Sequence, residues 1–294
     1  MLMDIVIKKR NILKSITLAT FCLSFAWTPG AKANDLDLVL TKAKNLSLQR
    51  DRLQATKVLR DYLEKEGLKS ENRLKAIKML KKVSEIFYEA KSLQAFELGK
   101  AKETISLAEA AKGFEEVQSM EALNTRPMEE LARIRLLQGE CDASLSWANR
   151  ALKENPYKES LVYLKAFALG CSGEPEQLLA FMQKDSLIKE DDLFRLSLGQ
   201  AYMVDGSYDE AKLWFAKIED QELPDKYYFL GVMYRGQGAD EYLKYFAKYV
   251  DLCNRKLKKQ SEQQQRDPRS CKETDSVKEK YKLLSGTSIQ KVLK

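Results

Sequence analysis

Apolar residues recur every three or four positions along most of the chain from residue 35 onward, with polar residues between them. This spacing is typical of amphipathic α-helices that bury one face. The pattern therefore predicts an all-α protein. In the segment 70–90 the apolar stripe consists of Leu74, Ile77, Leu80, Val83, Ile86, Phe87 and Ala90.

Residues 34–124 carry the helical pattern without a clean internal repeat. We expect two degenerate helical pairs here, stacked on the N-terminal end of the more regular units that follow. A separate helical bundle is the alternative. A short coiled coil is disfavoured because no strict heptad is sustained over three or four repeats.

Between residues 125 and 257 two sets of small residues advance together along the chain. Glycines recur at Gly139, Gly173, Gly206 and Gly238, with spacings of 34, 33 and 32 residues. Seven residues before each glycine stands a second small residue: Ala132, Ala166, Gly199 and Gly231. A period near 34 indicates a repeat of two helices per unit. We place the units at 125–158, 159–192, 192–225 and 224–257.

The units resemble the tetratricopeptide repeat (TPR) family. Its first-helix pattern of an aromatic residue, Leu-Gly and then Tyr is matched by Tyr227, Leu230, Gly231 and Tyr234. Three further residues match the second-helix and closing positions: Ala211, Phe215 and Pro156. The departures are Ser144 at a small position, Pro175 at a helix start and Leu243 where Ala is usual. The resemblance implies an α-α superhelix, a solenoid of TPR-like helical hairpins.

The two small-residue positions have different expected roles. Gly199 lies inside a helix, where glycine costs about 1 kcal/mol against alanine, so we expect it where the two helices of a unit cross closely. Gly206 lies between the helices, at a position that favours positive φ. By the same reasoning Gly231→Ala should be much milder than Gly231→Leu, because Ala132 and Ala166 hold the equivalent places.

The composition changes after Lys256. The segment KLKKQSEQQQRDPRSCKETDS is polar and contains Pro268, so it predicts a linker or long loop. Residues 258–294 would then form a polar tail with one short helix around 277–284. That helix either caps the solenoid or stays loose.

The first 33 residues have the order of a secretory signal peptide. Four basic residues from Lys8 to Lys14 precede an apolar run from Ile16 to Trp27, and Ala31-Lys32-Ala33 is a cleavage motif. A membrane anchor is the alternative, but the run is shorter than the roughly 20 residues that span a bilayer. We expect cleavage after Ala33, no later membrane span, and export to an oxidising bacterial periplasm.

Charge and composition narrow the function further. Residues 1–33 carry five basic residues and one acidic residue, so their removal lowers the net charge from +7 to +3. Such a balance gives no nucleic-acid footprint. The chain has no histidine, which excludes Ser-His-Asp and Cys-His catalysis and histidine metal ligation. No cysteine pair has metal-site spacing, and we expect neither a metal nor a cofactor.

Four cysteines remain after cleavage, and the stacking of a solenoid suggests how they pair. Cys141 opens the second helix of one unit and Cys171 closes the first helix of the next, so antiparallel packing brings them together. Cys253 and Cys271 flank the polar segment and can join with little strain. The alternative is four reduced, buried thiols.

The resemblance to the family also implies which residues line the concave groove of the superhelix. These are Arg126, Glu129, Arg133, Tyr163, Phe167, Leu196, Gln200, Met203, Tyr228 and Arg235. Aromatic residues and arginine are common interface anchors. For Tyr163, Phe167 and Leu196 the alternative is internal packing under an adjacent helix.

We interpret the chain as a non-catalytic scaffold or adaptor of the bacterial cell envelope that binds a partner protein or peptide in this groove. One alternative is a carboxylate-dependent hydrolase of envelope polysaccharide, which needs two carboxylates about 5–9.5 Å apart across a cleft. The other is a structural subunit of a larger assembly, marked by an exposed apolar patch on the convex side or at the terminal helices.

Overall fold

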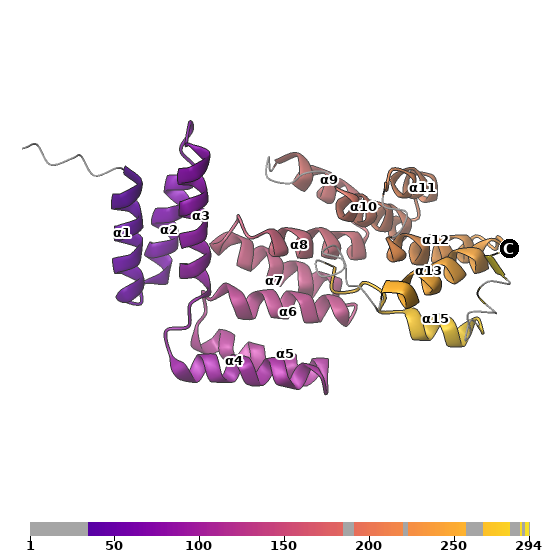
Figure 1. Ribbon diagram of the computed structural model, residues 1–294, viewed down its shortest axis with the longest axis horizontal. Coiled ribbons are helices and arrows are strands. Elements are labelled where there is room, and N and C mark those ends of the chain that lie inside the picture. The colour runs from indigo at the N-terminus through magenta and orange to yellow at the C-terminus, as the bar shows by residue number, and fades with distance from the viewer. Residues whose placement is uncertain are drawn as a thin grey trace, which may run out of the picture.

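A computed structural model describes residues 35–184, 191–219, 223–256 and 267–282, together with Ile289, Val292 and Leu293. Within these residues the regular elements are all α-helices, and consecutive helices pack side by side while the chain runs from one end of the long axis to the other (Figure 1). The predicted all-α solenoid of helical hairpins is confirmed. The predicted signal peptide over residues 1–33 and the linker residues 257–266 lie outside the described residues.

Pairs of consecutive helices build the solenoid, and the last four pairs fall within the four predicted units. The pairs are α4 (Ala90–Glu103) with α5 (Leu107–Met120), α6 (Thr125–Leu137) with α7 (Cys141–Glu154), α8 (Glu159–Ser172) with α9 (Pro175–Lys184), α10 (Asp192–Asp205) with α11 (Tyr208–Ala216), and α12 (Pro224–Gly236) with α13 (Tyr242–Lys256). The first helices of successive units also contact each other, α6 with α8, α8 with α10, and α10 with α12. A short helix, α15 (Thr274–Lys280), packs on α13.

The first three helices form a bundle of their own instead of a further pair. In α1 (Asp35–Leu48), α2 (Arg52–Leu63) and α3 (Ser70–Glu85) each helix contacts the other two, and they share one buried core. This arrangement matches the bundle alternative for this part of the chain. The next two helices, α4 and α5, pack on each other as a pair.

The small residues inside the first helices lie where the two helices of a unit cross closely, as expected. The side chain that faces the small residue from the second helix explains why some units have glycine there. A Cβ added to Gly231 would lie 2.7 Å from two ring atoms of Phe246, so the ring would have to move. Gly99 of α4 lies against Phe114 of α5 in the same way. It stands 33 residues before Ala132, so the small residue at the helix crossing recurs one unit further upstream. Glycine thus makes room for an aromatic ring, and even alanine would crowd it; that Gly231→Ala is milder than Gly231→Leu stays a prediction.

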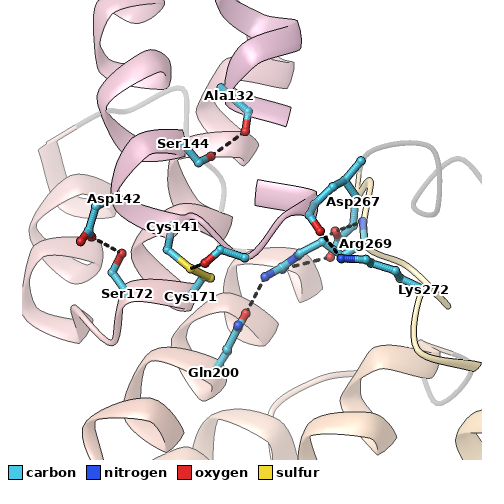
Figure 2. The surroundings of a disulfide bond; sticks show 12 residues. Ala132, Cys141, Asp142, Ser144, Cys171, Ser172, Gln200, Asp267, Arg269 and Lys272 are labelled. Carbon is cyan, nitrogen blue, oxygen red and sulfur yellow. Dashed lines mark hydrogen bonds and ion pairs between the residues drawn. A yellow bond between two sulfur atoms is a disulfide. The ribbon is translucent and has the colours of Figure 1, made fainter. Parts of the chain in front are cut away.

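Two other sequence features have local explanations. The turn glycines have the predicted positive φ, which is 79° at Gly139 and 90° at Gly206. Ser144, a departure from the family pattern, is fully buried and its hydroxyl donates to the Ala132 carbonyl at 2.8 Å (Figure 2). The hydroxyl thus links the two helices of its unit.

Gly199→Ala is expected to destabilise the protein by about 1–3 kcal/mol through overpacking. Its Cβ would lie within 2.8 Å of three ring atoms of the buried Phe215. Combining it with Phe215→Leu should recover part of the loss relative to the sum of the single variants, because the smaller side chain leaves room for the methyl group. Urea denaturation of the wild-type chain, the two single variants and the double variant measures this coupling. Strictly additive losses of unfolding free energy would contradict a close contact between Gly199 and Phe215.

Candidate partner-binding groove

The first helices of the units line two adjoining hollows at one end of the predicted groove. The larger, of about 400 Å³, lies among α3, α4, α6 and α8, and the smaller, of about 230 Å³, lies between α6, α8 and Pro268. Glu129, Glu130 and Ser160 line both. The hollows therefore form one depression lined by many charged side chains, which we call the charged hollow.

Arg133 is part of an ion-pair network that ties α6 to α4. Its Nε donates to Glu130 Oε2 at 2.8 Å and its Nη2 donates to Glu103 Oε2, while Lys100 Nζ lies 2.9 Å from Glu130 Oε1. Burial raises the pKa of the Glu103 carboxyl, but the hydrogen bond and charge of Arg133 outweigh burial and hold that pKa below its usual range. The network is thus a set of fixed charges.

A second ion pair joins α8 to α3 and α6. Lys158 Nζ lies 2.6 Å from Glu85 Oε1 and 2.5 Å from Glu129 Oε2, and Ser160 Oγ donates to Glu129 Oε1. Burial lowers the pKa of the Lys158 ammonium, but the two carboxylates outweigh burial and raise that pKa. Arg126 lines the same hollow with its guanidinium 4.5 Å from the centre of the Phe96 ring.

Towards the C-terminal end, several predicted groove residues are buried. Phe167 and Leu196 are fully buried, and Tyr163 is buried with its hydroxyl donating to the Asp191 carboxylate. Phe167 and Leu196 thus take the internal packing that was the alternative for them, whereas Tyr163 is buried but also lines the smaller hollow. The physical reason is the close approach of α8 and α10, where a Cβ on Gly170 would lie 2.7 Å from the Ser197 carbonyl oxygen.

The chain's own C-terminal residues contact two of the other predicted residues of this end, Gln200 and Arg235. Arg269 Nη1 donates to Gln200 Oε1 at 2.8 Å, and the same guanidinium lies 4.9 Å from the centre of the Phe167 ring (Figure 2). Arg235 is exposed and its Nη1 donates to the Tyr281 hydroxyl at 2.7 Å. Tyr228 packs against Tyr249, and Met203 is half-buried against the main core. The predicted groove is thus partly filled from within.

Sequence reasoning missed the residues that hold this segment. Asp225 of α12 and Asp267 of the segment are both buried, and Asp225 Oδ1 accepts from the Cys271 N–H at 3.2 Å. Burial, followed by the charge of Asp267, raises the pKa of Asp225 to about 7. The expected pairing of Cys253 with Cys271 was the available signal, because it places the polar tail beside α13.

Both expected cysteine pairs lie at disulfide distance. The Cα atoms are 5.7 Å apart in Cys141–Cys171 and also in Cys253–Cys271, within the range of disulfides. Figure 2 shows the first pair joining the start of α7 to the end of α8. The second pair anchors the C-terminal segment to α13.

No protein-family model matches the chain, and no curated protein matches it. A solved structure, a tetratricopeptide repeat protein from Parabacteroides merdae, is similar over 88% of this chain and 97% of its own, with a TM-score of 0.43 and 16% identity. Among the described helices, none has the length and apolar composition needed to cross a membrane. The described helices thus form an α solenoid of paired helices.

Proposed function

We propose that the protein is a non-catalytic scaffold of the bacterial periplasm that binds a partner protein or peptide along its concave face. One observation carries the proposal: this face already holds a non-helical stretch of polypeptide, residues 267–273, through side-chain and backbone hydrogen bonds. A surface that holds one peptide segment by such contacts is suited to holding another. The charged hollow continues this surface and offers fixed charges of both signs.

The electrostatics of the hollow support recognition over hydrolysis. An acid catalyst for glycoside cleavage needs a raised pKa beside an open cleft. Of the carboxylates that line the hollow, Glu129 and Glu130 are ion-paired, and the pKa of Glu103, which pairs with the lining residue Arg133, is lowered instead. Asp225 has a raised pKa, but it is buried beneath the C-terminal segment.

The proposed compartment rests on the N-terminal sequence and on the cysteines. The basic, apolar and small-residue order of residues 1–33 favours export, and the two cysteine pairs suit an oxidising compartment. Mass spectrometry of periplasmic material should give Asn34 as the first residue, and non-reducing peptide mapping should give the pairs Cys141–Cys171 and Cys253–Cys271. An intact Met1 on mature protein would contradict export with cleavage.

Site-specific photo-crosslinking in cells tests the binding proposal. A photoreactive residue at Glu97 or Ser160, which line the charged hollow, should capture an envelope protein. The matched control is Asn149, which is exposed on α7, a second helix of a unit. Capture at Asn149 alone, or no capture at any position, would contradict the groove. Adducts only with a second copy of this chain would instead favour the structural-subunit alternative.

A further inference from the structure

The segment 267–273 contacts successive helices of the solenoid through different groups. Arg269 reaches α8 and α10 by its contacts with Phe167 and Gln200. The backbone N–H of Glu273 donates to the Tyr249 hydroxyl of α13 at 3.1 Å, and Lys272 Nζ donates to the Leu137 carbonyl at the end of α6. The segment therefore crosses the face of the solenoid and does not only follow one helix (Figures 1 and 2).

Arg269 is the central residue of the contact because its guanidinium binds both the segment and the solenoid. Its Nε and Nη2 lie 3.1 and 3.2 Å from the two carboxylate oxygens of Asp267, while Nη1 is directed at Gln200. Asp267 is 3% exposed and Gln200 is 7% exposed. A planar guanidinium can bind a carboxylate, an amide oxygen and an aromatic face at once, which a lysine ammonium cannot do with the same geometry.

The segment itself fixes the position of its arginine. Asp267 is two residues before Arg269, and its carboxylate also accepts from the Arg269 backbone N–H at 2.9 Å. Pro268 between them lines the smaller hollow together with Tyr163 and Leu164. The acid thus holds the arginine from within the segment, while the proline and the arginine lie against the solenoid.

The Cys253–Cys271 bond keeps the segment beside this surface. The two bonded cysteines are 18 positions apart in sequence, and Cys271 lies two residues after Arg269. A tether of this length holds the segment at an effective concentration on the order of millimolar, so a free peptide in the micromolar range cannot compete.

We propose that the surface across α8, α10 and α12 is a binding site for a peptide segment with an acidic residue two positions before an arginine, and that residues 267–273 are its built-in occupant. This inference rests on the proposed function, because it names the chemistry of the partner segment for the same concave face. A partner segment of this kind exchanges with the chain's own segment when the tether is open.

Fluorescence anisotropy with a labelled peptide of residues 264–276, carrying Cys271→Ser, tests the proposal on the mature chain. The oxidised wild-type chain should bind the peptide weakly. The variant Cys253→Ser with Cys271→Ser and Arg269→Ala, which lacks the tether and the internal anchor, should bind it at least about tenfold more tightly. The matched control peptide carries Arg269→Ala and should lose this gain. Equal binding of both peptides, or no gain over the wild-type chain, would overturn the proposal.

Hydrogen exchange on the oxidised chain provides a second measurement that does not require release of the segment. Gln200→Ala should speed amide exchange in residues 267–273 and leave α4 and α5 unchanged, whereas unchanged exchange in 267–273 would overturn the proposal.

The outcomes of the peptide-binding and hydrogen-exchange experiments are separate from the crosslinking result. A captured partner that binds without an acid-and-arginine segment would overturn this inference alone, and peptide exchange without a captured partner would count against the scaffold function alone.

Discussion

Arg52→Ala is expected to destabilise the protein by about 3–5 kcal/mol, the range for removing one partner of a buried ion pair. Arg52 Nη2 lies 2.6 Å from Glu121 Oε2, and both side chains are 5% exposed. Arg52 Nη2 and Asn124 Nδ2 also donate to the Ile86 carbonyl, and Glu121 Oε1 accepts from the Tyr88 N–H at 2.9 Å. Without Arg52 the Glu121 carboxylate would stay buried without its cation.

This ion pair joins parts of the chain that are far apart in sequence. Arg52 begins α2 of the N-terminal bundle, and Glu121 follows α5 of the solenoid, 69 residues later. We therefore expect the variant to loosen the bundle from the solenoid, with faster hydrogen exchange in α1–α3 before exchange rises in α6–α13. Arg52→Lys should not restore stability, because an ammonium cannot serve the same set of acceptors.

Lys65→Ala is the matched control for Arg52→Ala. Lys65 Nζ lies 2.8 Å from Asp35 Oδ2, but both side chains are more than half exposed, and such pairs contribute about 0–1 kcal/mol. Guanidinium denaturation compares the two variants. A loss of under about 1 kcal/mol in both would show that the Arg52–Glu121 pair does not hold the two parts together.

The hairpins could be predicted from sequence because their determinants are local and periodic. A glycine or alanine at the crossing and a glycine at the turn recur in each unit, and each acts on residues within about half a period. Whether glycine or alanine is needed at the crossing could not be predicted from the repeat, because it depends on the side chain that faces it from the second helix. Gly199 faces Phe215, whereas the same offset from Ala132 leads to Ala148.

The state of the groove was not predictable from the repeats. The family pattern assigns Gln200 to the concave face, but its exposure depends on what covers that face. The covering residue, Arg269, lies 69 residues after Gln200 in a polar segment without helical periodicity. The contact rests on charge and hydrogen bonding, which leave no periodic signal in sequence.

The acidic pair beneath the segment is a second feature that only the fold reveals. Asp225 lies at the start of α12 and Asp267 lies after the polar linker, and the fold buries both. Taking two carboxylates out of water beside one guanidinium leaves one negative charge uncompensated. The fold can relieve this by keeping a proton on Asp225.

Asp225→Asn is accordingly expected to remove a pH-dependent loss of stability. The groups that face Asp225 are Asp267, Arg269, Ser270 and the Cys271 N–H of the segment, and Tyr249 of α13 feels its charge. The pKa of Asp225 rises from its ordinary value of 3.8 to about 7 on folding, through burial first and Asp267 second. Between these two values the folded chain binds a proton that the unfolded chain has lost. The contribution of this group to stability therefore falls as the pH rises from about 4 to about 7, by on the order of 4 kcal/mol.

The amide introduced by Asp225→Asn would stand in for the protonated acid, since its oxygen can still accept from the Cys271 N–H and its NH₂ group can donate to Asp267. The unfolding free energy of Asp225→Asn minus that of the wild-type chain should therefore increase steadily from pH 4 to pH 7. Comparing the two proteins cancels the titration of the other carboxylates. Asp275→Asn, which changes a carboxylate 99% exposed on α15, is the matched control and should give a difference that does not vary with pH. A pH-independent difference for Asp225→Asn as well would mean that Asp225 is ionised in the folded chain at neutral pH, and that Arg269 and the backbone donors suffice to hold two charged carboxylates in the buried contact.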